Sequence, residues 1–298
     1  MGIINENSFI ETVHMKGLQI SLIASGDGTE VIYHRLEPGI MWGIEPQKGW
    51  EALEYLCVLS GELILRSGHE TKTIKTGDSF YRAPVVEHHV FEAADTTEFL
   101  YVTSRPVFFH YSKVTKEMME LSISIEEKDG YTRDHCQRIN KLSMLVGKTL
   151  ELDSKQLVNL NLASFLHDVG KLRIPLEILQ KPSKLTPEEW EIMKKHSTFG
   201  RQILEETGLP ILIDAGKVVE QHHERFDGKG YPLGLKGSEI SIEASIISII
   251  DSYDAITSDR VYKKGRSKEE AKKELLNYRG TMYHPEILDV FLELIDQI

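Results

Sequence analysis

The sequence has few of the features that mark secreted or membrane proteins. Only two cysteines occur in 298 residues, Cys57 and Cys136, which excludes a disulfide scaffold and fits a reducing compartment. The first residues, MGIINENSFIETV, contain no basic region followed by an apolar run, so they do not predict a signal peptide. No apolar run approaches the roughly 20 residues that a membrane-spanning helix needs. We therefore expect a cytoplasmic protein without a membrane partner.

A surplus of basic residues is also missing. With 35 Lys and Arg against 46 Asp and Glu, the formal net charge is −11, which argues against a nucleic acid polymer as a partner. An anionic small molecule is not excluded, because the charge around its own site decides binding and a bound metal can dominate that charge.

Two domains are predicted, residues 1–112 and 113–298, because the residue pattern changes near position 112. Before it, short runs rich in β-branched and aromatic residues, such as 30–34 and 99–102, alternate with turn residues such as Pro38-Gly39. Strands at this density predict an all-β sandwich or small barrel. After it, apolar residues recur with a helical period, which predicts an all-α bundle.

Helix starts are predicted by capping patterns in the second half. Thr186 is followed by proline and two glutamates, which indicates an N-cap, a first helical residue and a reciprocal cap. The pairs Asp153 with Gln156 and Ser267 with Glu270 repeat the capping spacing.

Histidines and aspartates interrupt the apolar stripes of several predicted helices. They are His135, His167, Asp168, His196, His222, His223 and Asp251, with Asp254 one turn after Ile250. A lone buried histidine is usually bonded to a neighbour, but five imidazoles and several carboxylates facing one interior need a common partner. A metal provides one, and imidazole with carboxylate suits Fe, Mn, Zn or Ni. The ligands are too many for one tetrahedral Zn, so a two-metal site is predicted.

The adjacent pairs in this set fit two ions. Neighbours on a helix point about 100° apart, so His167-Asp168 and His222-His223 can each reach both ions. Asp168 is suited to bridge the ions with its two oxygens. Two ions about 4 Å apart can hold a bridging hydroxide and a phosphate oxygen together for in-line attack on phosphorus.

The segment 167–171, HDVGK, resembles the HD signature of the HD phosphohydrolase superfamily, and 222–232, HHERFDGKGYP, resembles the GYP signature. Together they resemble the HD-GYP family, which cleaves cyclic di-GMP. The likeness covers about 113–298 and extends to the segments DGYTRDH at 129–135, KPSKLT at 181–186 and DSYDAITSDR at 251–260.

The resemblance implies roles for matching residues. One metal would be held by His135, His167, Asp168 and Asp251, and the other by Asp168, His196, His222 and His223. Lys171 would act with Asp168 in catalysis by meeting the scissile phosphate or the bridging water, and Arg260 and Lys263 would contact substrate phosphates. Tyr131 replaces a glutamate that holds a third metal in some members, which favours two divalent ions, Fe or Mn ahead of Zn, Ni or Mg.

The glycine-rich loop around Tyr231 has a physical interpretation of its own. Its glycines permit tight turns and a close approach of backbone to ligand. Lys229 is expected to meet a phosphate and Tyr231 to stack on a base, while the alternative for Tyr231 is packing within a rigid loop.

Residues from about 20 to 110 resemble a cupin barrel. Glu54 followed by Gly61 resembles the end of the first cupin motif, and 77–84, GDSFYRAP, followed by His88 and His89, resembles the second. The paired histidines expected before Glu54 are absent, since 46–50 reads PQKGW, so a complete three-histidine metal site cannot form. The resemblance implies either a sensor that takes a small ligand, lined by Trp42, Trp50, Tyr55 and His88, or a barrel used for stability or homodimer formation. A weak site at Glu54 with His88 or His89 is a further alternative.

Cyclic di-GMP phosphodiesterase activity, giving pGpG or GMP through a two-metal-bridged hydroxide, is the predicted function. The alternatives are a non-catalytic effector that binds a cyclic dinucleotide and a metal phosphohydrolase that acts on another nucleotide. The complete ligand set favours the enzyme.

Overall fold

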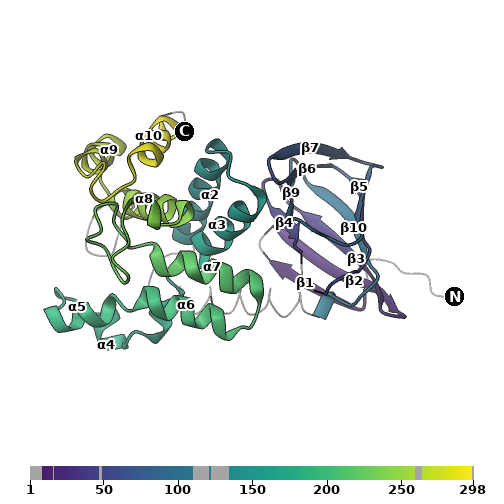
Figure 1. Cartoon of the computed structure of the whole chain (residues 1–298), viewed down its shortest axis with the longest axis horizontal. Helices are drawn as coiled ribbons and strands as arrows, with labels where there is room; N and C mark the ends of the chain where they lie inside the picture. Colours follow the sequence, from purple (N-terminus) through teal and green to yellow (C-terminus); the bar gives the residue numbers. More distant parts are fainter. Residues whose placement is uncertain are drawn as a thin grey trace. The chain divides into compact units, whose positions relative to one another are not determined.

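The computed structural model describes residues 9–15, 17–46, 49–109, 121, 134–258 and 264–296 (Figure 1). The described residues fall mainly into two compact units, one of strands and one of helices. The predicted domain boundary near residue 112 lies outside the described residues. This order of an all-β unit followed by an all-α unit confirms the expected fold class.

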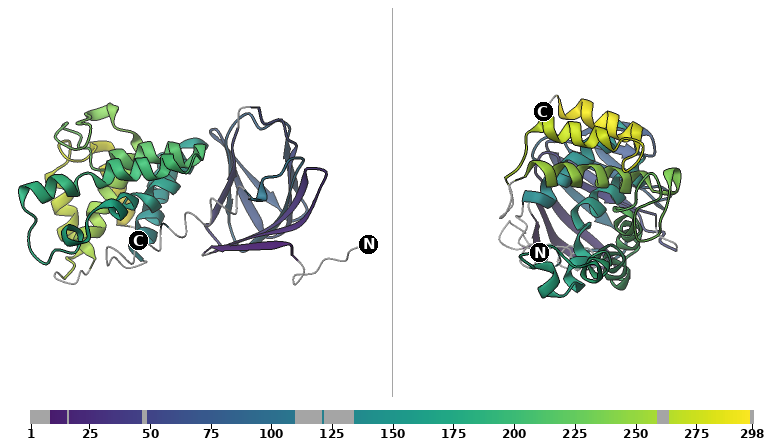
Figure 2. Two further views of the ribbon diagram at one scale, coloured as in Figure 1. Left: turned by 90° about the horizontal axis from the view of Figure 1, so that it is seen from below. Right: turned by 90° about the vertical axis from the view of Figure 1, so that its left-hand side faces the viewer.

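In the part of the chain that the structure describes, ten strands form two antiparallel sheets. They are β1 (Glu11–Met15), β2 (Leu18–Gly26), β3 (Thr29–Leu36), β4 (Met41–Ile44), β5 (Glu54–Ser60), β6 (Glu62–Ser67), β7 (Glu70–Lys75), β8 (Ser79–Arg82), β9 (His89–Ala93) and β10 (Thr97–Thr103). One sheet has the order β1-β2-β3-β10-β5-β8 and the other β4-β9-β6-β7. The two sheets form facing walls, as in a jelly roll (Figure 2).

The alternation of side chains builds the core of this unit. Along β10, every second residue from Thr97 to Thr103 is buried, so Phe99 and Tyr101 face the interior. The β10–β3 register sets Phe99 beside His34, and their rings stack with centroids 4.6 Å apart. Gly39, at a predicted turn, and Gly77, at the start of the second cupin-like motif, have φ of 80° and 87°, a conformation that side chains disfavour.

The described part of the second unit is mostly helical. Its helices are α2 (Asp134–Thr149), α3 (Ser154–Leu166), η1 (Val169–Arg173), α4 (Leu176–Leu179), α5 (Pro187–Met193), α6 (His196–Glu206), α7 (Pro210–Gln221), η2 (Gly237–Glu239), α8 (Ile242–Thr257), α9 (Lys268–Asn277) and α10 (Pro285–Ile295). Helix α2 packs on α8, and α6 packs on both α7 and η1.

The predicted caps are present at two helix starts. Thr186 accepts a hydrogen bond from the Glu189 amide while the Glu189 side chain accepts one from Thr186, which completes a capping box at α5. Ser267 and Glu270 make the same reciprocal pair at α9. Helix α3 begins at Ser154, directly after the expected cap Asp153.

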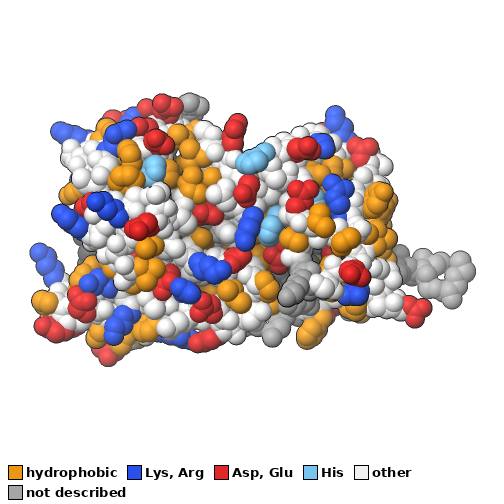
Figure 3. All heavy atoms as spheres, in the orientation of Figure 1, with side chains coloured by type: hydrophobic (Ala, Val, Ile, Leu, Met, Phe, Trp, Pro, Cys, Tyr) orange, Lys and Arg blue, Asp and Glu red, His pale blue; other side chains and the backbone are white. Residues whose placement is uncertain are grey.

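Charged side chains of both signs are interspersed over the face shown in Figure 3. Among the described helices, none combines the length and the apolar character that crossing a membrane requires.

Candidate metal centre

Helix ends bring the predicted histidines together. His167 and Asp168 lie between α3 and η1, His196 begins α6, and His222 and His223 follow the last turn of α7. His135 and Asp251 come from within α2 and α8, which pack against each other. His135, His167, Asp168, His196 and His222 are buried, and His223 and Asp251 are partly buried.

Three of the histidines are oriented by carbonyls of their own turns. The Nδ1 atoms of His167, His196 and His222 lie 3.0, 2.8 and 2.6 Å from the carbonyl oxygens three residues earlier. A carbonyl can only accept, so each Nδ1 carries a proton, and each Nε2 presents a lone pair when its ring is neutral. The three Nε2 atoms are therefore the donor atoms available to a cation.

His135 is oriented by a carboxylate instead. Its Nδ1 donates to Asp254 Oδ2 at 2.7 Å, and Arg138 grips the same carboxylate with Nε and Nη2 at 2.5 and 2.9 Å. Burial alone would raise the pKa of Asp254, but these bonds hold it well below its ordinary value. Asp254 is thus an ionised partner that turns His135 Nε2 toward Asp251, whose Oδ1 lies 3.9 Å away.

The candidate ligands form two groups. In one, the nearest donor atoms of His135, His167 and Asp251 all lie within 4.8 Å of one another. In the other, those of His196, His222 and His223 meet the same limit. These are the two sets that the family pattern assigned to separate metals.

Asp168 connects the two groups through its two oxygens. Oδ2 lies 3.2 Å from His167 Nε2, and Oδ1 lies 3.6 Å from His196 Nε2. Lys171 Nζ lies 2.9 Å from Oδ2. A carboxylate with one oxygen toward each group has the placement of a bridging ligand.

The residues fit a pair of cations. His196 Nε2 lies 3.3 Å from His222 Nε2 and 3.0 Å from His223 Nε2, and burial lowers the pKa of all three imidazoles, that of His222 to about 3. In neutral rings whose Nδ1 holds the proton, His196 and His222 direct lone pairs at each other, and a cation between them removes that repulsion. His167 differs, because burial lowers its pKa but the neighbouring Asp168 carboxylate raises it to about 9. Without metal this ring is therefore protonated at neutral pH, and a cation would take the place of the proton on Nε2.

A close backbone contact fixes the two histidine-bearing segments together. A Cβ on Gly170 would lie 1.7 Å from the carbonyl oxygen of His196 and 2.4 Å from the amide nitrogen of Gly200. Only glycine therefore allows η1, which follows Asp168, to pack this closely on the first turn of α6.

The glycine-rich loop is held by a buried carboxylate. Glu224 accepts hydrogen bonds from the amides of Leu233, Gly234 and Leu235 at 2.6, 3.1 and 3.0 Å. The loop brings the Tyr231 ring against His223, with centroids 4.9 Å apart and a 32° tilt. Lys229, in contrast, is exposed, and its amide bonds to Asp227.

Some expectations lie outside the described residues, and others are refined by the structure. Arg260, Lys263 and Tyr131 lie outside the described part of the chain. Sequence reasoning placed Asp254 on the interior stripe without seeing that it holds His135, and it gave Glu224 no role. The role of Glu224 follows from the loop's fold, because every non-proline residue has a backbone amide and the sequence does not show which amides converge on one carboxylate.

In the strand unit, the residues expected to line a ligand cavity lie in different environments. Trp42 packs in the core against His34 and Phe99. Tyr55 alternates with the buried Glu54 and Leu56 and bonds Ser79 at an exposed position, so placing it in the lining was wrong. The described residues of this unit contain no group of three or more candidate metal ligands.

Glu54 and His89 are the buried polar residues near the second motif. Trp50 Nε1 donates to Glu54 Oε1 at 2.7 Å, and burial raises the pKa of Glu54. Both ring nitrogens of His89 are buried and have no hydrogen-bond partner among the described residues. His89, rather than the less buried His88, therefore faces the interior.

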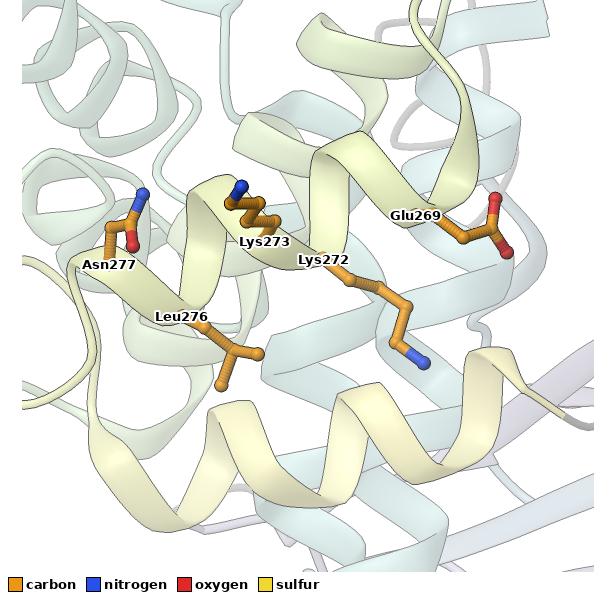
Figure 4. Close-up of a pocket in the computed structure, with 5 residues that line it drawn as sticks. All are labelled: Glu269, Lys272, Lys273, Leu276 and Asn277. Atoms are coloured by element: carbon orange, nitrogen blue, oxygen red, sulfur yellow. The ribbon is translucent and has the colours of Figure 1, made fainter.

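A shallow pocket of about 410 Å³ lies elsewhere on the helical unit. It is lined by Glu269, Lys272, Lys273, Leu276 and Asn277, all from α9 (Figure 4). None of the candidate metal ligands contributes to it.

Comparison with known proteins finds similarity to solved structures and to curated proteins. The chain is similar to an RmlC-like cupin from Shewanella frigidimarina, at 13% identity, covering 35% of this chain and 89% of that chain with a TM-score of 0.30. The chain is 40% identical over 197 residues to a cyclic di-GMP phosphodiesterase from Thermotoga maritima, covering 66% of this chain and 54% of that protein.

A second relative differs in its named substrate. The 3'3'-cGAMP-specific phosphodiesterase 2 of Vibrio cholerae is 35% identical over 190 residues, which is 62% of this chain and 36% of that protein. The chain spans about half or less of the length of these curated relatives.

The family model that matches this chain is that of the HD domain, over residues 118–287. The match includes the histidines and aspartates of both candidate ligand groups and extends over more than half of the sequence. The chain therefore belongs to the HD domain family.

Proposed function

We propose that this chain is a metal-dependent phosphodiesterase that hydrolyses cyclic di-GMP to pGpG or GMP. The observation that carries the proposal is the pair of ligand groups joined by Asp168, whose two oxygens lie toward His167 and His196. Two divalent ions, when bound, would supply Lewis-acid charge against phosphate oxygens and lower the pKa of a water molecule. We propose Fe or Mn as these ions, because imidazole and carboxylate donors suit both.

The chain's own residues prepare the site for an anionic substrate. Asp254 and the carbonyls of the preceding turns bond the Nδ1 atoms of these imidazoles and so fix the orientation of each ring. Lys171, whose side chain is largely buried, places a positive charge 2.9 Å from Asp168 Oδ2. A charge fixed at this point would stabilise negative charge that develops on the phosphate, because it needs no reorganisation during the reaction.

A cyclic GMP-AMP substrate is the second candidate. The relatives include proteins named for each cyclic dinucleotide, at 40% and 35% identity. The same metal chemistry serves both substrates, so the contacts to the bases must discriminate between them. Competition between the two dinucleotides at equal concentration will show which has the higher kcat/KM.

The first test uses purified, metal-analysed protein under anaerobic conditions with Mn(II) or Fe(II). Cyclic di-GMP is added and the products are separated by chromatography, with Asp168→Ala as the inactive comparison. We expect pGpG or GMP from the wild type alone. Tight binding without product would contradict the enzyme and support the effector alternative.

For the strand unit we propose a sensor that binds a small polar ligand. Its support is the pair of buried polar side chains, Glu54 and His89, that face the interior among aromatic rings. Buried polar groups require partners, and a ligand with both donors and acceptors would provide them. Ligand-induced thermal stabilisation that Glu54→Gln abolishes would support this role, and a concentration-dependent dimer without any ligand response would favour homodimer formation instead.

A further inference from the structure

Helix α5 is a well-anchored element that contributes nothing to the core. None of its seven residues, Pro187 to Met193, is buried. Its start is nevertheless fixed by the capping box, and Lys181 Nζ lies 2.5 Å from Glu189 Oε2. A short helix gains most of its stability from packing, so a capped helix without buried residues invites a functional explanation.

The exposed face of α5 carries an aromatic ring and a cation beside the candidate metal centre. Trp190 and Lys194 are one turn apart and therefore lie on the same side of the helix. The Trp190 ring lies 6.4 Å from the Tyr231 ring at 82°, and Lys194 Nζ lies 5.8 Å from the centroid of the Tyr231 ring. Tyr231 in turn packs on His223, so Trp190 is separated from a candidate ligand by one ring.

Trp190 exposes aromatic ring surface that a ligand can contact, whereas the Tyr231 ring is in contact with neighbouring side chains. The Tyr231 ring has His223 tilted against it and the Lys194 ammonium over it. Trp190 is 46% exposed, although it is the largest side chain of its helix. A single exposed apolar residue is ordinary on a protein surface, but this one stands at a right angle to a ring of the site. The two rings meet edge to face, which leaves the exposed surface of the Trp190 ring available to a flat heterocycle.

We propose that Trp190 is a substrate-binding residue that stacks against a purine base of the cyclic dinucleotide substrate. This inference rests on the proposed function, because the base is placed there only when the substrate's phosphate reaches the metal centre. Every nucleobase has a π-face, and stacking on an aromatic side chain stabilises a bound base. Lys194 Nζ is paired with Glu191 Oε1 at 2.8 Å, so its charge is largely balanced and the stacking contact carries the proposal.

The test is steady-state kinetics on cyclic di-GMP with the full chain and its metals. Trp190→Ala should raise KM about tenfold and leave kcat nearly unchanged, because stacking holds the substrate without touching the reacting atoms. Trp190→Phe should retain most of the affinity. Leu276→Ala is the matched control, since Leu276 is 47% exposed on α9. A KM for Trp190→Ala within twofold of the wild type would overturn the proposal.

Binding without turnover separates this inference from the proposed function. Metal-loaded protein is titrated with a non-hydrolysable phosphorothioate analogue of cyclic di-GMP while tryptophan emission is recorded for wild type and Trp190→Phe. Trp190 is the only tryptophan outside the strand unit, where Trp42 and Trp50 lie, so quenching confined to the wild type supports stacking. Equal quenching in both proteins overturns stacking even where hydrolysis is observed. If Trp190→Phe loses the quenching and metal-loaded wild type hydrolyses no cyclic di-GMP, stacking is supported and the proposed phosphodiesterase activity is contradicted.

Discussion

The histidines of the candidate centre show how single residues can be aimed by short-range contacts. A carbonyl three residues back fixes the rings of His167, His196 and His222, whereas His135 depends on a carboxylate from a different helix. The first kind of contact forms whenever the local turn forms. The second requires α2 and α8 to be docked, so His135 should be the more sensitive of the four to mutation around it.

Asp168→Ala should remove metal and activity while the helical content persists. Its two oxygens face both ligand groups, so its loss weakens both sites at once, and we expect the metal content to fall from two ions per chain toward none. Activity should fall at least about 100-fold, since the groups that hold the metals act as a unit. Elemental analysis with far-ultraviolet circular dichroism will measure this. Asp214→Ala, on α7, is the control, and wild-type metal content in Asp168→Ala would contradict the bridging role.

Asp254→Asn should weaken metal binding without abolishing it. The neutral amide loses the charge that pairs with Arg138 and orients His135, and loss of such an outer partner typically costs about 10- to 100-fold in metal affinity. Competition with a chelator of known affinity measures the change. Asp289→Asn removes a similar two-bond arginine pair on an exposed surface and should have no effect on metal affinity. Equal affinities for the two variants would refute the orienting role.

The sequence predicted which residues gather in the candidate metal centre, but it did not predict the role of each one. Polar residues on an apolar helical stripe mark a site because burying them without partners is costly. Asp251 and Asp254 lie three residues apart on one such stripe, so spacing could not tell which of them faces the metals and which holds His135. That choice depends on Arg138, which reaches Asp254 only after the helices pack. The assignment of individual metal ligands stays a prediction.

At the scale of elements, the glycine-rich loop depends on one buried acceptor. Glu224→Gln halves the acceptor capacity that serves the amides of residues 233–235, and bonds to a charged group are worth about 1.5–3 kcal/mol. These amides should therefore exchange with deuterium roughly 10- to 100-fold faster. Glu239→Gln, which relaxes only the exposed bond to the Lys236 amide, is the control. Unchanged protection of 233–235 would show that other contacts hold the loop.

Strands and caps were the elements that the sequence predicted most directly. Thr186 and Ser267 make their expected reciprocal caps because capping depends on residues only three apart. The side on which Tyr55 projects was predicted wrongly, because a strand's period of two gives alternation but not which set faces inward. The buried neighbours Glu54 and Leu56 decide that question once both sheets are present.

At the scale of the whole molecule, metal removal should affect the two units unequally. A ligand that binds only the folded state stabilises it by about 4 kcal/mol at a thousand times its Kd. The described strand unit has no group of three or more candidate ligands, so chelation should lower the unfolding temperature of the helical unit alone. Calorimetry with circular dichroism at a helical wavelength can separate the transitions. A shift of the strand transition, or none in the helical one, would contradict this assignment.

His167, His196 and His222, whose rings are oriented by backbone carbonyls, suggest a way to design metal sites. Each of the three rings brings its orienting group within its own segment of four residues, 164–167, 193–196 or 219–222. Such segments are portable, because grafting one onto another helix terminus transfers the ring together with its tautomer. A designer would then need only to converge helix ends, without building an outer layer of hydrogen bonds, to obtain a preorganised cluster of imidazole donors.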